Sequence, residues 1–195
     1  MYQSVFKRMI DFVCALAALV ILSPLFLVLI VWVKADSKGP AFFRQRRIGR
    51  FEREFRILKF RTMRADTPPD IPTHQFSRSE SYITKAGRFL RKTSLDELPQ
   101  LLNILSGKMS FVGPRPALWN QYDLTSLRRE RGVGALRPGL TGLAQVSGRD
   151  ELPIPVKVEY DARYAAEIGF VTDLKILLKT VKSVLKSDGI VEGRQ

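Results

Sequence analysis

Two adjacent carboxylates, Asp96 and Glu97, lie in a stretch with the spacing of a helix start. Ser94 and Glu97 are three residues apart, as in a capping box, which predicts both acids in the first helical turn. Ionised carboxylates are favoured there by the helix dipole. An ionised Asp96 could attack phosphorus, and Glu97 could hold Mg²⁺ against phosphates. Acidic first turns are also ordinary helix starts, so the stretch alone leaves both interpretations open. Pro99 falls late for such a cap, so the helix starts one or two residues later or bends there.

Several arginines stand beside rigid or flexible turns. Arg115 lies between Pro114 and Pro116, which restricts the backbone around one guanidinium and suits bidentate phosphate binding. Arg137 precedes a Pro-Gly pair and Arg149 follows a glycine. A structural turn with a solvated arginine is the alternative. The sequence contains no Walker A loop and no dinucleotide fingerprint, and its basic and aromatic residues do not interleave as in nucleic-acid-binding modules.

An apolar run from 12 to 33 contains no charged residue and could form a helix of roughly 33 Å, close to the thickness of a bilayer core. Ser23-Pro24 lies at its middle, where proline predicts a kink. The run is either a kinked helix that spans the membrane or a re-entrant helix that returns to the same face. Basic residues mark the cytoplasmic side, and they flank the run at both ends, which favours the re-entrant form. These flanking residues are Lys7, Arg8, Lys34 and Lys38.

Composition limits the class of protein. The 195 residues suffice for one folded core with an anchor, and the net charge of +13 indicates an anionic partner, which is nucleic acid, a membrane surface or a phosphate-rich substrate. The single cysteine, Cys14, excludes a disulfide within the chain and fits a reducing compartment. With one histidine, His74, a His/Cys zinc site is excluded, so any metal is a hard cation held by carboxylates and phosphates.

The remaining sequence predicts a small set of elements that position these residues. Short strands with a turn at Gly49 are expected in 39–63, a loop in 64–83, a helical pattern in 84–105 interrupted near Thr93-Ser94 and ended by Gly107, and a polar helix in 118–131. Residues 173–186 form an amphipathic pattern with leucines on one face and lysines on another. That helix either packs on the core with a solvated lysine face or lies on anionic lipid.

The chain resembles the bacterial sugar transferases known as small monotopic phosphoglycosyl transferases. The resemblance runs from Lys7-Arg8 to about Lys186. The matching stretches are Phe6-Lys7-Arg8 with Asp11-Phe12, Ser23-Pro24, Lys59 to Met63, Ser94 to Leu101, Met109 to Pro116, and Arg137 to Gly142. The resemblance implies a mostly helical α/β fold. It implies a re-entrant membrane helix in residues 1–38, broken at Ser23 and Pro24, a single catalytic domain in 39–195, and interfacial amphipathic helices.

The resemblance also implies an activity. Asp96 would attack the β-phosphorus of a UDP-sugar, UMP would leave, and polyprenyl (undecaprenyl) phosphate would take the phosphosugar in a ping-pong reaction, the first membrane step of bacterial glycoconjugate synthesis. Glu97 would be associated with the cofactor Mg²⁺. The resemblance implies that the protein is located in the bacterial inner membrane, with its catalytic domain on the cytoplasmic face. Membrane phospholipids are expected partners, and nucleic acid is not. The substrate-binding residues it implies are Lys59, Arg61, Arg91, Arg115, Arg137, Arg149 and Asp173.

The chain departs from the family pattern near Arg149. The family often has Trp where Leu143 stands and Asn where Ser147 stands, which affects selectivity for sugar or nucleotide. The sugar, the polyprenol length, the oligomeric state and the role of the loop 66–82 are not indicated. The alternative function is a non-enzymatic, membrane-anchored basic module that binds anionic lipid or nucleic acid, which would explain the charge and the anchor but not the Asp-Glu pair.

Overall fold

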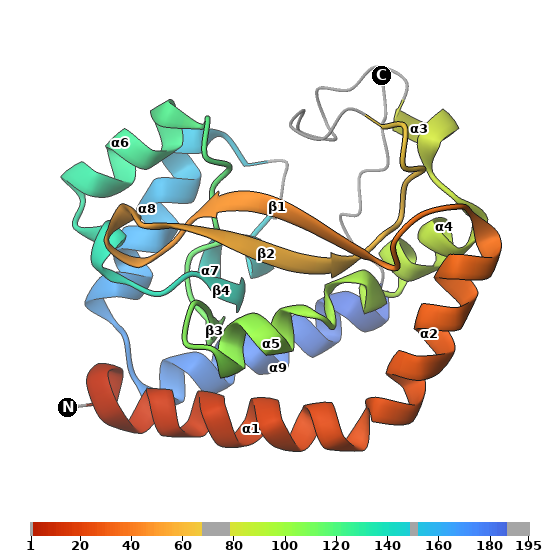
Figure 1. Ribbon diagram of the computed structural model, residues 1–195. Coiled ribbons are helices and arrows are strands. Elements are labelled where there is room, and N and C mark those ends of the chain that lie inside the picture. The colour runs from red at the N-terminus through yellow and green to blue at the C-terminus, as the bar shows by residue number, and fades with distance from the viewer. Residues whose placement is uncertain (1, 68–78, 149–151, 187–195) are drawn as a thin grey trace.

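The N-terminal apolar run forms two helices. The computed structural model describes residues 2–67, 79–148 and 152–186, and it begins with a π-helical turn, η1 (Tyr2–Phe6). Helix α1 (Lys7–Ile21) and helix α2 (Ser23–Asp36) meet at Leu22 with a bend of 64° (Figure 1). Pro24 lies in the first turn of α2, where its missing N–H costs no helical hydrogen bond. The Ser23 hydroxyl donates to the carbonyl of Val20 at 2.8 Å.

The bend at Ser23-Pro24 is therefore confirmed, and its sharpness matters for the membrane prediction. Among the described residues, neither helix alone has the length and apolarity to cross a bilayer, whereas the bent pair has both when taken together. Length and composition do not distinguish a broken span from a re-entrant turn. The re-entrant topology stays a prediction.

An antiparallel hairpin follows α1 and α2. Strand β1 (Phe42–Ile48) pairs with β2 (Glu54–Phe60) in a register that runs from Phe42 opposite Phe60 to Ile48 opposite Glu54. A 3₁₀ turn, η2 (Arg50–Glu52), closes it just after Gly49, as the sequence predicted. Phe55, Ile57 and Phe60 of β2 are buried.

Among the described residues that follow, helices, short 3₁₀ turns and loops predominate, with two three-residue strands. The elements are α3 (Ser79–Tyr82), α4 (Lys85–Lys92), the 3₁₀ turn η4 (Leu95–Glu97), α5 (Gln100–Leu105), β3 (Ser110–Val112), α6 (Tyr122–Glu130), the 3₁₀ turn η5 (Val133–Ala135), β4 (Gly139–Thr141), α7 (Leu143–Val146), α8 (Ile154–Ala166) and α9 (Phe170–Lys186). The predicted helix at 118–131 begins later, at Tyr122, and α8 and the strand pair were not anticipated. The mostly helical α/β class is confirmed. The predicted division of the chain at residue 38 is not tested. Part of the predicted loop, residues 68–78, lies outside the described residues.

Strands β3 and β4 pair in parallel, with Ser110 opposite Gly139 and Val112 opposite Thr141. Their backbones come so close that side chains do not fit between them. A Cβ atom on Gly139 would lie 2.1 Å from the backbone nitrogen of Gly113, and one on Gly142 would lie 2.1 Å from the Gly113 carbonyl oxygen. The segments around Arg115 and Arg137 are thus joined backbone to backbone.

Helix α5 lies at the centre of the main core. It packs against α1 on one side and β2 on the other (Figure 1). Leu101 and Ile104 of α5 are buried with Ala15 of α1 and Ile57 of β2. Because Asp96 and Glu97 lie just before this helix, the core fixes their distance from α1.

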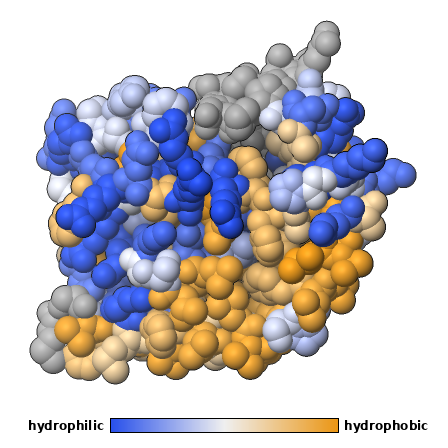
Figure 2. All heavy atoms as spheres, in the orientation of Figure 1, coloured by the Kyte–Doolittle hydropathy of each residue, from blue (hydrophilic) through white to orange (hydrophobic). Residues whose placement is uncertain are grey.

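Hydrophobic side chains gather on one side of the surface. Figure 2 shows them along the lower edge and the lower right, over α1 and α2, with hydrophilic residues above. The amphipathic helix α9 contributes more: Leu174, Leu178 and Val181 are 45%, 64% and 58% exposed, whereas Ile176 is buried. The expectation that the leucine face of α9 packs on the core is therefore wrong for these three residues. Their exposure favours the alternative of a helix lying on lipid.

Candidate active site

The Asp-Glu pair lies in a 3₁₀ turn between two helices. Ser94 has φ 57°, in the left-handed region, and its side chain makes no capping hydrogen bond. The predicted capping box is therefore wrong. Thr84 is the residue that caps a helix here, since its hydroxyl accepts from the backbone N–H of Gly87 at 3.0 Å. A 3₁₀ turn follows Ser94, and helix α5 begins only at Gln100, after Pro99. The helix therefore starts further along the chain than the one or two residues that the position of Pro99 predicted.

Lys59 holds the two carboxylates together. Its ammonium donates to Glu97 Oε1 at 2.7 Å and lies 3.7 Å from Asp96 Oδ2. The side chains of Lys59, Asp96 and Glu97 are 19%, 12% and 20% exposed, so they are largely desolvated but open to a ligand. Lys59 belongs to β2, which places a strand cation beside the turn between α4 and α5.

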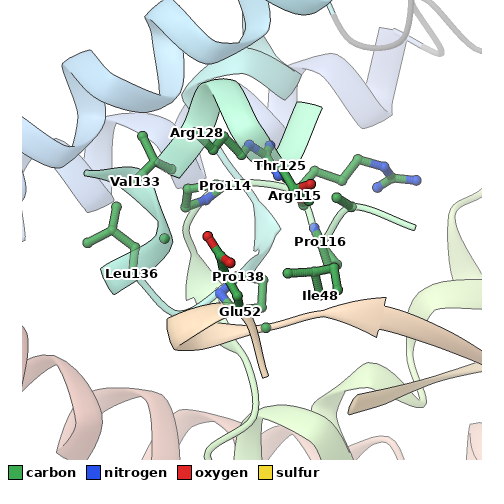
Figure 3. A pocket seen from close by; sticks show the side chains of 13 residues that line it. Ile48, Glu52, Pro114, Arg115, Pro116, Thr125, Arg128, Val133, Leu136 and Pro138 are labelled. Carbon is green, nitrogen blue, oxygen red and sulfur yellow. The ribbon is translucent and has the colours of Figure 1, made fainter. Parts of the chain in front are cut away.

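Arg115 is a second cation in contact with Glu97. Its Nη2 lies 3.5 Å from Glu97 Oε1, and its side chain is 40% exposed. A pocket that is open to solvent lies behind this segment and is lined by Pro114 and Pro116, among other residues. In Figure 3 the Arg115 side chain extends away from that pocket, so its guanidinium is presented to the surface rather than to the interior.

The environment separates the pKa values of the two acids. Burial raises the pKa of Asp96 above its ordinary value, and repulsion by Glu97 adds to this, against attraction by Lys59, Arg91 and Arg115. Burial acts in the same direction on Glu97, but attraction by Lys59 and Arg115 outweighs it and lowers its pKa to about 2. Glu97 thus keeps its charge over a wide pH range, while Asp96 is the acid whose ionisation is sensitive to its surroundings.

Two other predicted binding residues have clear local contacts. Arg91 donates from Nε to the Thr62 hydroxyl at 2.9 Å and is close enough to Asp96 to lower its pKa. Arg61 is buried and donates to backbone carbonyls at the end of α2, including that of Ser37 at 2.7 Å. Arg91 therefore joins the cluster, whereas Arg61 satisfies the carbonyl groups at a helix C-terminus.

The remaining predicted residues lie apart from the pair or outside the description. Arg137 donates from Nε to the carbonyl of Gly107 at 3.1 Å, beyond the C-terminal end of α5. Asp173 is buried against Lys7, Tyr2 and Tyr164. Arg149 lies outside the described residues. A substrate contact by any of these three stays a prediction.

Two positioning groups were missed from the sequence. Arg128 pairs with the buried Asp161 through Nη2 at 2.6 Å and also donates to the backbone carbonyl of Arg115 at 2.8 Å. Asn103 donates to the Arg56 carbonyl and accepts from the Leu58 N–H, both at 2.9 Å, which ties α5 to the edge of β2. The sequence signal was weak: Arg128 is one of several charged residues in a polar helical pattern, and Asn103 is a polar residue among leucines, which does not reveal either partner.

The pair has the chemistry of a magnesium site that is completed by a ligand. In the part of the chain that the structure describes, no group of three His, Cys, Asp or Glu side chains is arranged to hold a metal. Mg²⁺ commonly takes one or two carboxylates and completes its shell with waters and substrate phosphates. Both cation contacts of Glu97 use Oε1, so the geometry is compatible with a metal at Oε2. The residues present therefore fit Mg²⁺ bound together with a phosphate ligand.

Comparison with known proteins gives a family. The model for bacterial sugar transferases matches residues 2–187. The chain is 39% identical over 197 residues to the exopolysaccharide production protein ExoY of Sinorhizobium fredii, with 94% of this chain and 87% of that protein covered. It is 40% identical over 191 residues to the UDP-glucose:undecaprenyl-phosphate glucose-1-phosphate transferase of Xanthomonas campestris, with 94% and 40% covered.

A third relative is the undecaprenyl-phosphate galactose phosphotransferase of Salmonella typhimurium, 38% identical over 201 residues, with 94% of this chain and 41% of that protein covered. The chain thus spans most of ExoY and less than half of the other two relatives. Relatives named as transferases at this identity contradict the alternative of a non-enzymatic basic module. The chain belongs to the bacterial sugar transferase family and is a transferase.

Proposed function

We propose that this enzyme transfers a phosphosugar from a UDP-sugar to undecaprenyl phosphate and releases UMP. The named activities of the relatives support the reaction class. The observation that carries the proposal is a pair of carboxylates with separated pKa values inside a group of three cations, Lys59, Arg91 and Arg115. This arrangement suits a reaction in which a carboxylate meets a diphosphate, because the cations offset the negative charge that gathers there.

In the proposed first step Asp96 attacks the β-phosphorus of the donor. A bond forms between an Asp96 carboxylate oxygen and that phosphorus, the bond from the phosphorus to the bridging oxygen breaks, and UMP leaves with the electron pair. In the second step the phosphate oxygen of undecaprenyl phosphate attacks the same phosphorus and Asp96 is released. Asp96 suits this role because burial leaves its carboxylate poorly solvated while Lys59, 3.7 Å away, favours the ionised form.

Glu97 and the arginines position the donor in this proposal. Mg²⁺, when bound, would neutralise charge on the diphosphate oxygens. Glu97, ionised over a wide pH range, is the residue that would hold it. The partly exposed Arg115 offers a guanidinium fork to a phosphate, and its flanking prolines reduce the ordering needed to bind. Arg128 keeps this segment in place through the Arg115 carbonyl.

We further propose that α1 and α2 form a re-entrant hairpin that holds the Asp-Glu pair at the cytoplasmic face. The 64° bend, the basic residues at both ends and the exposed apolar side chains of α1, α2 and α9 support this. Cysteine labelling from outside the cell tests it, since positions 3 and 38 should both react only from the cytoplasmic side. Labelling of the two positions from opposite faces would contradict the hairpin and indicate a span.

The covalent step is tested with donor alone. UDP-sugar and Mg²⁺ without lipid should give UMP and add the mass of a phosphosugar to the peptide that contains Asp96, and Asp96→Asn should give neither. Glu97→Gln should keep the fold and lose most activity. Adding undecaprenyl phosphate to the unsubstituted protein that carries the phosphosugar should then remove the phosphosugar from Asp96. If UMP appears only when donor and lipid are both present, the ping-pong mechanism is wrong although the overall reaction stands.

A further inference from the structure

A second polar cleft lies beyond the opposite end of α5 from the Asp-Glu pair. It has an empty volume of about 310 Å³ and opens to solvent. It lies between the first turns of α1, the strand β3 and the segment that leads into β4. The polar residues that line it are Gln3, Lys7, Asp11, Arg50, Ser110, Arg137 and Tyr164. It belongs to neither the Asp96 cluster nor the pocket behind Arg115.

The wall of this cleft contains a hydroxyl without a partner. Ser110 is fully buried, and its Oγ makes no hydrogen bond to any residue that the structure describes. Its backbone N–H is satisfied by the Pro138 carbonyl at 2.9 Å, which fixes the residue in place. A buried hydroxyl without a partner costs about 1–3 kcal/mol. A ligand atom that accepts a hydrogen bond in the cleft would remove this cost.

The charges around Arg137 favour a negative ligand. Burial and repulsion by Arg50 and Arg8 lower its pKa, and only the Asp11 carboxylate acts in the opposite direction. Within the described residues, the hydrogen bonds of Arg137 and Arg50 use Nε alone, to the carbonyls of Gly107 and Ala135. Their terminal Nη groups therefore remain for another acceptor.

One acid, Asp11, lines the cleft together with Arg137 and Arg50. Its Oδ1 accepts from the Phe111 N–H at 3.1 Å. Among the described residues, Asp11 forms no ion pair with Arg137 or Arg50, although its charge acts on Arg137. Two partly buried guanidinium groups, held near each other without a shared anion, fit a group with several acceptor oxygens.

We propose that this cleft binds a phosphate group, with the guanidinium groups of Arg137 and Arg50 on its oxygens and Ser110 Oγ donating to one of them. The phosphate would come either from solution or from the headgroup of a lipid. Exposed apolar residues on the neighbouring turns, Val5, Phe6 and Met9, would lie beside the chains of such a lipid. The site is separate from the proposed reaction, so it can exist even if Asp96 is not the nucleophile.

Binding of labelled inorganic phosphate to the full chain in phosphate-free maltoside micelles tests the proposal. Arg115→Gln first weakens binding at the Asp-Glu cluster, so that the second site is measured alone. In that background Arg137→Gln should weaken phosphate binding at least about tenfold, and Ser110→Ala about two- to tenfold, as expected for one charged and one neutral hydrogen bond. Arg56→Gln, on an exposed residue of β2, is the control and should change nothing.

Ser110→Ala also separates binding from folding. Without phosphate it should melt at the same temperature as the parent or higher, because it removes an unsatisfied hydroxyl. With phosphate it should gain less stability than the parent. If Ser110→Ala and Arg137→Gln both bind phosphate as tightly as the Arg115→Gln parent, the proposal is overturned and the cleft holds only water. Phosphatidic acid added to the micelles identifies the source: competition with labelled phosphate indicates a lipid headgroup, and its absence indicates phosphate from solution.

Discussion

Two buried acids of this protein, Asp173 and Asp96, differ in how many hydrogen bonds their carboxylate oxygens accept. Asp173 accepts three hydrogen bonds, from Lys7 and Tyr2 at Oδ2 and from Tyr164 at Oδ1. Asp96 is equally buried, but its nearest cation, Lys59, lies 3.7 Å away and donates to Glu97 instead. The first acid has its hydrogen-bonding capacity met within the protein, and the second does not.

This difference indicates different roles. Asp173 joins Tyr2 of η1 and Lys7 of α1 to α9, and so stabilises the packing of the N-terminal helix on the rest of the protein. Asp96 is held in a desolvated position that raises its pKa, which costs stability and is typical of groups that react. The family resemblance implied a functional role for both acids. Their hydrogen-bond partners separate them.

The largest effect is expected from Asp96→Asn. Turnover measured as UMP release should fall by at least about a thousandfold, as loss of a nucleophile does in other covalent enzymes. The melting temperature at neutral pH should stay equal or rise, because a buried charge with a raised pKa is removed. Substantial residual activity, or a clear fall in melting temperature, would place Asp96 with Asp173 as a structural acid.

Asp173→Asn should have the opposite pattern. It leaves the Lys7 ammonium buried without its partner, so the free energy of unfolding should fall by roughly 3 kcal/mol. Chemical denaturation in micelles measures this. Glu167→Gln, which removes an exposed ion pair with Arg163, is the control and should cost under about 1 kcal/mol. A stable Asp173→Asn variant with no activity would show that Asp173 contacts substrate.

A tenfold effect is expected from Arg115→Lys. The charge remains but the guanidinium fork is lost, so kcat/KM for the donor should fall about tenfold or more, on the order of 1.4 kcal/mol. Steady-state kinetics at fixed Mg²⁺ measure it. Arg129→Lys provides the control, since Arg129 pairs with Glu52 on the exposed turn of the hairpin. Equal losses in both variants would count against a phosphate contact by Arg115.

The smallest effect concerns pH. Asp96 must be ionised to attack, so activity should be lost as the pH falls through its raised pKa. Lys59 lowers the pKa of Asp96, so Lys59→Met should raise it further and move this acid limb to higher pH. The limb is read from the pH dependence of UMP release at saturating donor. A limb that stays in place would indicate that another group controls the reaction.

The sequence predicted the parts of this site that depend on local pattern. Strand residues around Lys59, the turn at Gly49, the break at Ser23-Pro24 and the end of the helical pattern at Gly107 all follow from propensity and turn chemistry. The capping box failed because Ser94 adopts a left-handed conformation that its sequence spacing does not reveal. The contacts of Arg61 with Ser37, of Arg128 with Asp161 and of Asp173 with Lys7 could not be predicted, since the partners are 24, 33 and 166 residues apart in the chain.

The backbone junction between β3 and β4 restricts how this protein can change. The close approach of Gly139 and Gly142 to Gly113 leaves no room for even a methyl group. A library of single substitutions should therefore tolerate no side chain at these positions, while the exposed α6 residues nearby accept most. A change that moves the Arg115 segment must also move the Arg137 segment, because no side chain between them can absorb the shift. The Asp-Glu cluster and the proposed phosphate cleft thus share one rigid frame, and altering the shape of either requires changes on both sides of the junction.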